Sequence, residues 1–119
     1  MPRTVAEHLA DLRYVGRFEG AERLGEACGD ERLKVQVGLW WDSDQGAVRA
    51  RYRATTCAAL IAYAEAACAL AERWGPQAVT AARLREAVRG VHPAHRDRAG
   101  LVALAFARAL ALAPVKGSA

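Results

Sequence analysis

The sequence has no apolar run long enough to cross a membrane. The longest apolar stretch, residues 57–71, is interrupted by Glu65 and is shorter than the ~20 residues that a membrane helix needs. Cysteine is also scarce, with three residues in all, and residues 1–10 carry scattered charges in place of an apolar signal segment. We therefore expect a cytoplasmic protein with free thiols, no disulfide framework and no membrane partner.

Charge of one sign is not concentrated anywhere in the chain. Lys and Arg number 17 against 13 Asp and Glu, which gives a net charge of +4, and the arginines of the second half are dispersed over expected helix surfaces. Proteins that bind nucleic acids usually gather such charge on one stripe, so we expect no nucleic-acid partner. A solvated face, or a patch that meets an acidic protein, explains the excess.

What the sequence does contain is a change of hydrophobic period. Hydrophobic residues make up 53% of the 119 residues, which indicates one globular domain over residues 1–119, ordered from 5 to 112 with a short tail. Apolar residues alternate along 33–41 and 48–54, which predicts a hairpin with an arginine-rich solvated face.

Helical spacing follows the hairpin and also precedes it. The expected helices span residues 4–16, 58–74, 80–90 and 99–112. The glycine-rich stretch 17–30 is expected to be a loop with room for one short strand. Strands grouped together and helices grouped together predict an α+β fold, in which a small antiparallel sheet has helices packed on one face.

Two cysteines flank the expected hairpin. Cys28 lies in Ala27-Cys28-Gly29-Asp30, where glycine permits a tight turn that lets the thiolate and the carboxylate of Asp30 face one point. Cys57 ends the second strand and begins a helix, whose N-terminal dipole favours a thiolate. Because a hairpin returns the chain to its start, Cys28 and Cys57 can meet at a metal ion or carry a persulfide. Both can equally be small buried hydrophobic residues.

Cys68 is expected in the core, and His8 is expected at or near the surface. Cys68 stands on the apolar stripe of the helix that Cys57 begins, roughly 16 Å along the axis from Cys57 at about 1.5 Å per residue. That separation is too large for a shared ion, so we expect Cys68 in the core. His8 lies in an amphipathic helix and is expected at the surface or its boundary.

A histidine-containing turn offers further potential ligands. His92 and His95 flank Pro93, and Asp97 follows closely. Two imidazoles and a carboxylate in one loop can ligate a metal ion. More often, a loop of this composition is simply exposed to solvent.

These motifs resemble those of the U-type iron–sulfur cluster scaffolds, the IscU proteins and the N-terminal domain of NifU. The run Ala27-Cys28-Gly29-Asp30 matches the family's ACGD motif, and residues 33–57 match the hairpin that ends at the second family cysteine. Residues 14–18, Tyr-Val-Gly-Arg-Phe, are similar to the turn after the family's first helix. The resemblance covers residues 5–112 and implies the same α+β fold.

The chain departs from the family at the third cysteine, which opens the last helix. Pro93 and the apolar pattern of that helix set Arg98 at this position and Asp97 before it. Thr56 and Ala58 replace the glycines that usually flank the second cysteine. Arg98 would place a permanent positive charge beside the site, which disfavours a cation but can pair with Asp30 or hold a thiolate.

The resemblance implies a scaffold or carrier, not an enzyme, that binds a [2Fe–2S] cluster or one iron or zinc ion. Cys28, Asp30 and Cys57 are the implied ligands, and His95 or Asp97 would complete the four that a cluster usually takes, with Arg98 lining the site. A cysteine desulfurase and an apo iron–sulfur acceptor are the implied partners, and a second copy of the chain could supply missing ligands. Two alternatives stay open. One is a metal-free, scaffold-like interaction protein that docks on a desulfurase or another assembly partner, and the other is a thiol or persulfide relay on Cys57.

Overall fold

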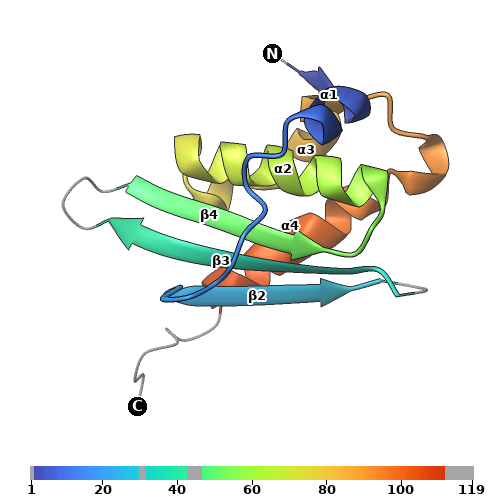
Figure 1. Cartoon of the computed structure of the whole chain (residues 1–119). Helices are drawn as coiled ribbons and strands as arrows, with labels where there is room; N and C mark the ends of the chain where they lie inside the picture. The colour runs from blue at the N-terminus through green and yellow to red at the C-terminus, as the bar shows by residue number, and fades with distance from the viewer. Residues whose placement is uncertain (1, 30–31, 43–46, 112–119) are drawn as a thin grey trace.

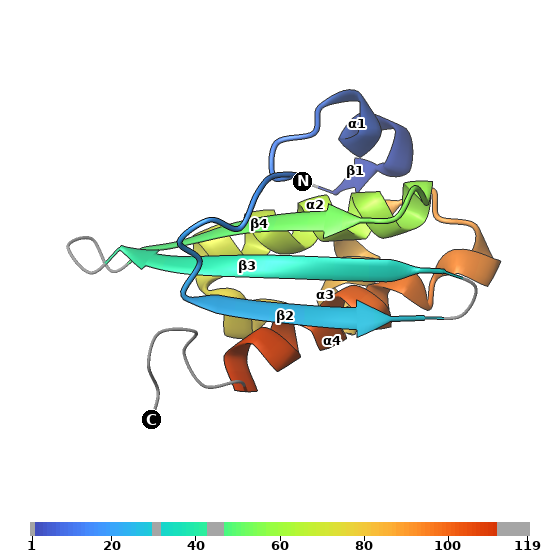
Figure 2. The same ribbon diagram turned by 60° about the horizontal axis from the view of Figure 1, so that its bottom comes forward.

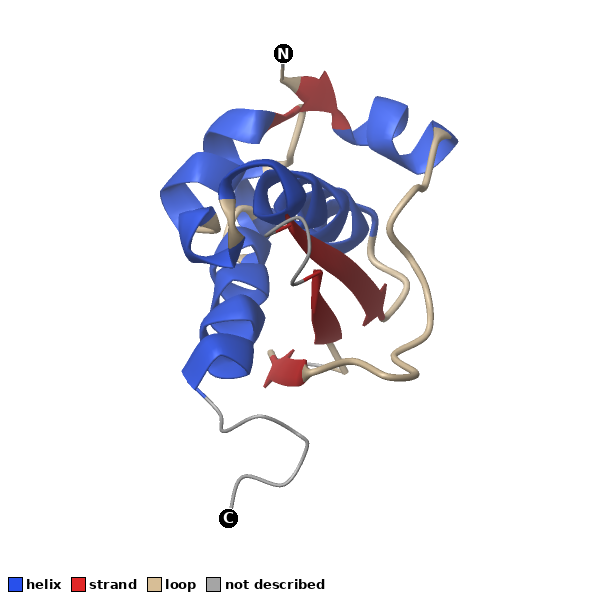
Figure 3. Cartoon of the chain, turned by 90° about the vertical axis from the view of Figure 1, so that its left-hand side faces the viewer, coloured by secondary structure: helices blue, strands red, loops and turns tan. Residues whose placement is uncertain are grey.

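The computed structural model describes residues 2–29, 32–42 and 47–111 and has an α+β architecture (Figure 1). Strands β2 (Arg23–Cys28), β3 (Lys34–Asp42) and β4 (Ala47–Ala54) form an antiparallel sheet in the order β2-β3-β4. Helices α2 (Ala58–Trp74) and α4 (Arg98–Ala111) lie on one side of this sheet (Figure 3). The other elements are β1 (Arg3–Thr4), α1 (Val5–Ala10), the 3₁₀ turns η1 (Pro76–Ala78) and η2 (Pro93–His95), α3 (Ala81–Ala87) and β5 (Val88–Arg89). The predicted fold class is confirmed.

The alternation predicted for the hairpin is present in the structure. β3 pairs with β4 in a register that sets Leu39 opposite Ala50. Val35, Val37 and Leu39 are fully buried and form a core with residues of α2 and α4. This apolar side of the sheet is removed from water, while the intervening residues face the other way.

The stretch expected to be mainly loop contains a six-residue strand, β2. Its glycine has a packing role, because a Cβ at Gly25 would collide with the carbonyl oxygen of Ala105 and lie 2.6 Å from the backbone nitrogen of Ala109. Helix α4 therefore lies directly against the backbone of β2. Glycine at this position marks a close approach of two elements, in addition to the loop preference that the sequence suggested.

Helix starts follow their predicted caps. Thr4 caps α1 and forms a capping box with Glu7, and the Thr80 hydroxyl accepts a hydrogen bond from the backbone amide of Arg83 at 3.2 Å. α2 ends at Trp74, where the Gly75-Pro76 pair stops it as expected. Within the described ranges, no helix is both long and apolar enough to cross a membrane.

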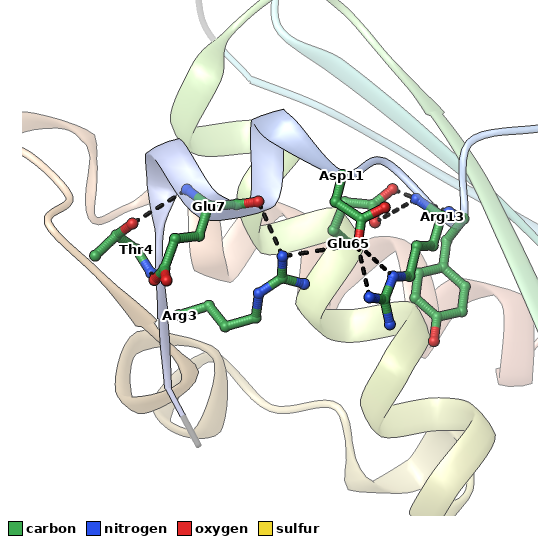
Figure 4. A network of polar contacts seen from close by, with 7 residues as sticks. Arg3, Thr4, Glu7, Asp11, Arg13 and Glu65 are labelled. Carbon is green, nitrogen blue, oxygen red and sulfur yellow. Dashed lines mark hydrogen bonds and ion pairs between the residues drawn. The ribbon is translucent and has the colours of Figure 1, made fainter.

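Helix α1 ends at Ala10, earlier than the expected end at residue 16. The reason is that two backbone amides after the helix form hydrogen bonds to a side chain on another helix. The carboxylate of Glu65 on α2 accepts from the amides of Arg13 (2.8 Å) and Tyr14 (3.0 Å) (Figure 4). Glu65 is 2% exposed, so these bonds are shielded from water. They direct the chain away from the helix axis and towards the sheet.

After α1 the chain runs along the edge of β4 and then crosses the sheet face that the helices leave open (Figure 2). Val15 forms a parallel bridge with Tyr52 at that edge. Farther on, the ring of Phe18 lies over Gly38, where a Cβ would come within 2.7 Å of a ring carbon. The crossing segment thus covers part of the open face and leaves the end of the sheet near Cys28 uncovered.

Candidate functional site

One end of the sheet brings together the segments that contain the predicted ligands. Cys28, the last residue of β2, is opposite Lys34, the first residue of β3. Lys34 in turn forms two hydrogen bonds with Thr55, whose backbone amide donates to the Lys34 carbonyl at 3.0 Å and whose hydroxyl accepts from the Lys34 amide at 3.1 Å. Cys57 follows two residues later at the start of α2. The segments of both cysteines therefore lie at the right-hand end of the sheet in Figure 1.

Cys28 lies on the open face of the sheet. Ala27, its neighbour, is fully buried against the helices, so strand alternation turns Cys28 to the other side, where it is exposed. Its sulfur lies 3.8 Å from a carboxylate oxygen of Glu26 on the same face. Glu26 also accepts from Gln36 at 2.9 Å and forms an ion pair with Lys34 at 3.6 Å.

Cys57 is half-buried on the helix side of the sheet and is the N-cap residue of α2, with extended backbone (φ −144°, ψ 116°). Its side chain makes no capping hydrogen bond. The guanidinium of Arg98, at the start of α4, lies near enough to interact electrostatically with this thiol. The pKa of Arg98 is raised, first by its hydrogen bond to Asp97 and also by this contact with Cys57.

The residues before α4 are arranged around the same arginine. The guanidinium of Arg98 lies 2.7 Å from the Asp97 carboxylate, and this hydrogen bond holds the pKa of Asp97 below its usual range. The Asp97 side chain is 74% exposed and the Arg98 side chain 19% exposed. His95 is exposed in η2, with its ring 5.6 Å from that of His92.

A cavity of about 430 Å³ lies beside this arrangement. Gly29 and Leu33, on either side of the β2–β3 connection, form one wall, and Asp97, Arg98 and Leu101 of the α4 start form the other. Asp30, which follows Gly29, lies outside the described residues, so its predicted role as a ligand stays a prediction. The Gly29 turn and the start of α4 nevertheless border one common space.

The structure brings only some of the predicted ligands together. Arg98 pairs with Asp97 and interacts electrostatically with Cys57, whereas the sulfur of Cys28 contacts Glu26 on the open face. Among the described residues, no three His, Cys, Asp or Glu side chains lie close enough together to hold a metal ion. The proposed set of Cys28, Asp30, Cys57 and either His95 or Asp97 stays a prediction.

The predicted location of Cys68 is confirmed, and that of His8 is wrong. Cys68 is fully buried in the core, as expected, and burial raises the pKa of its thiol well above the usual range. His8, expected at the surface or boundary, is only 6% exposed, because the side of α1 that carries His8 packs against α2. Neither ring nitrogen of His8 has a hydrogen-bond partner in the described parts of the chain.

The substitution Cys68→Ala tests the structural role of this thiol. Removing a buried sulfur without repacking leaves a small cavity, so we expect the free energy of unfolding to fall by about 1–2 kcal/mol. Urea unfolding followed by circular dichroism measures the change. Metal content should be the same as in the unmodified protein, and a loss of metal in this variant would contradict the separation of Cys68 from the site.

Comparison with known proteins adds one relative. The chain is 34% identical over 111 residues to a protein of Rubrobacter xylanophilus named bifunctional protein NifU/MnmA. The chain is similar to a NifU-named protein. The match covers 87% of this chain and 22% of the relative, so the chain spans about a fifth of that protein's length. No family model matches the sequence.

Sequence reasoning missed the polar residues buried between α1 and α2. Glu65 was noted only as an interruption of the apolar run, yet it is almost fully buried and receives two backbone hydrogen bonds. A single carboxylate inside a long apolar helix is a usable signal, because a buried charge needs partners. His8, one helix away, gave no comparable signal in an otherwise amphipathic pattern.

Proposed function

We propose that the chain is a NifU-like protein of iron–sulfur cluster assembly that holds a cluster, or one iron or zinc ion, as its cargo. The observation that carries this proposal is the similarity to a NifU-named relative over most of the chain, together with the ACGD run in residues 27–30. The meeting of the Cys28 and Cys57 segments at one end of the sheet supports it. Binding and transfer of cargo require no turnover, so the proposed role is not enzymatic.

The proposed ligands are Cys28, Asp30 and Cys57, with His95 or Asp97 as the fourth. Thiolates suit iron and zinc, and carboxylate or imidazole groups can complete either coordination shell. Arg98 lines this site, pairs with Asp97 and interacts electrostatically with Cys57. A guanidinium that cannot lose its proton opposes a cation at the same point, so we expect weaker retention of cargo than three thiolates would give.

A second candidate function follows from that same arginine. Arg98 pairs with Asp97 and interacts electrostatically with Cys57 without a metal ion, and no three-ligand group is present among the described residues. A scaffold-like protein that keeps the fold and docks on an assembly partner without cargo would have this arrangement. Its Asp30–Arg98 pair would involve a residue outside the described ranges.

The proposal extends to partners and cellular setting. A cysteine desulfurase would supply sulfur, an apo iron–sulfur protein would receive the cargo, and a second copy of the chain could share a cluster. Residues 1–119 would act as one NifU-like domain in the cytoplasm. The second part of the relative's name, MnmA, is not transferred to this chain, because the chain spans only 22% of that protein.

Metal and sulfide analysis of protein purified without oxygen tests the proposal. We expect substoichiometric iron or zinc that falls severalfold in Cys28→Ser and in Cys57→Ser, because each removes one of the few proposed thiolate ligands. Cys68→Ala is the matched control and should keep its metal. Protein that contains no iron, zinc or sulfide after anaerobic reconstitution would favour the metal-free docking function.

A further inference from the structure

One face of helix α2 is covered neither by the sheet nor by α4. Ala66, Ala69, Leu70, Arg73 and Trp74 recur at spacings of three and four residues and line a cavity of about 1090 Å³. His8 of α1 lines the cavity, and so do residues of η1 and α3. From Glu65 to Trp74 the cleft follows α2 for roughly 14 Å, at about 1.5 Å per residue.

One end of the cleft has unpaired positive charge. Among the described residues, neither Arg73 nor Arg83 has a carboxylate partner: Arg73 lies over the ring of Trp74 at 5.3 Å, and Arg83 contacts the Ala78 carbonyl at 3.4 Å. Trp74 is 61% exposed, which is a large fraction for an aromatic side chain of this size. Two guanidinium groups without a carboxylate partner among the described residues, beside an open aromatic ring, favour a carboxylate or phosphate attached to an apolar body.

The other charges in the lining are largely neutralised. Arg13 pairs with Asp11 at 2.6 Å, and Arg3 lies 4.0 Å from the same carboxylate (Figure 4). Glu65 is engaged by the two backbone amides described above. Glu86, on α3, is the remaining acidic residue of the lining, so Arg73 and Arg83 leave an excess of positive charge at that end.

The far end of the cleft has a buried polar group without a partner. His8 lines the cavity, is 94% buried, and has no hydrogen bond to either ring nitrogen from any described residue. Burial lowers the pKa of His8, which keeps the ring neutral and able both to donate and to accept one hydrogen bond. A polar group that reaches this point would satisfy a nitrogen that the protein leaves unpaired.

We propose that this cleft binds an elongated amphipathic organic anion. Its carboxylate or phosphate pairs with Arg73 and Arg83. Its apolar body lies along Ala66, Ala69 and Leu70 beside Trp74. A polar group at its far end hydrogen-bonds to His8. The site is separate from the proposed cargo site, because none of the described residues lines both cavities and Trp74 lies at the opposite end of α2 from Cys57.

Displacement of the fluorescent sulfonate 1-anilinonaphthalene-8-sulfonate measures binding to the cleft. We expect decanoate and decyl phosphate to displace the dye at concentrations at least tenfold lower than decanol or inorganic phosphate. Comparing the two decyl anions decides between carboxylate and phosphate as the preferred head group. Equal displacement by decanol would overturn the anionic requirement, and equal displacement by inorganic phosphate would overturn the apolar one.

Variants with matched controls locate the bound anion. Arg73→Gln combined with Arg83→Gln should weaken decanoate binding at least tenfold, whereas Arg53→Gln, on the exposed side of β4, should not change it. Ala69→Trp fills the cleft from an exposed position and should abolish binding. Ala82→Trp adds the same ring to an exposed position on α3 outside the lining and should have no effect.

The His8 contact has its own readout. ω-Hydroxydecanoate should bind several times more tightly than decanoate to the unmodified protein, and His8→Leu should remove that preference while decanoate still binds. Circular dichroism of each variant shows whether it is folded. Binding that survives both Ala69→Trp and the double arginine substitution, or an absence of displacement by either decyl anion, would overturn the proposal.

Discussion

A single methyl group added at Gly25 should destabilise the protein more than almost any other small change. The new Cβ would meet the carbonyl oxygen of Ala105 and the nitrogen of Ala109, which are backbone atoms of a helix and cannot rotate away. Helix α4 would have to move off β2, so we expect Gly25→Ala to lower the free energy of unfolding by about 3 kcal/mol. The melting midpoint should fall by roughly 10 °C.

Gly100→Ala is the matched control, with the same added methyl group. Gly100 lies inside α4, and apart from its chain neighbours and its own helix backbone a Cβ there would meet no atom of the described residues within 4 Å. Because alanine favours a helix more than glycine does, this change should stabilise the protein by about 0.5–1 kcal/mol. Urea unfolding of both variants measures the two changes. Equal stability of Gly25→Ala and the unmodified protein would contradict the close contact between α4 and β2.

The features that the sequence predicted well are local ones. Period-two alternation identified β3 and β4, and capping residues such as Thr4 and Thr80 identified helix starts. β2 was underestimated because its glycine is required by α4, more than seventy residues later in the chain. A glycine that permits close packing and a glycine that forms a loop look alike in a single sequence.

Tertiary contacts also explain where the first helix was misjudged. The helix ends early because the Glu65 carboxylate accepts hydrogen bonds from the amides of Arg13 and Tyr14. No local pattern in residues 5–16 predicts a hydrogen-bond partner on α2. The burial of His8 is a consequence of the same docking. Amphipathic periodicity places His8 on a side of its helix, but it does not tell which neighbouring element covers that side.

The sequence could predict that the Cys28 and Cys57 segments meet, but it could not predict the direction of the Cys28 side chain. A hairpin returns the chain to its start, and the segments of Cys28 and Cys57 do lie at one end of the sheet. The direction of the Cys28 side chain follows from the burial of Ala27, which only the packing of α4 decides. The partner of Arg98 that the structure describes is Asp97, its own neighbour in sequence; the predicted partner, Asp30, lies outside the described residues.

Arg98→Cys should produce the largest functional change of any single substitution. It removes the guanidinium that pairs with Asp97 and acts electrostatically on Cys57, and it adds a thiol at the start of α4 beside the Gly29 turn. A [2Fe–2S] cluster is usually held by four protein ligands, most often thiolates, so the added thiol should complete a set that Cys28, Asp30 and Cys57 leave short. We expect iron and acid-labile sulfide per chain to rise severalfold after anaerobic reconstitution, with visible absorbance.

Two controls separate the thiol from the lost charge. Arg98→Ser removes the same guanidinium without adding a strong iron ligand, and Arg96→Cys adds a thiol at an exposed position two residues away. Only Arg98→Cys should gain a cluster if the thiol has to face the cavity beside Gly29. A gain of equal size in Arg98→Ser would mean that the positive charge alone limits binding, and the unmodified ligand set would then be sufficient. No gain in any of the three variants would count against a cargo site at this end of the sheet and favour docking without metal, because charge and ligand number would both have been corrected.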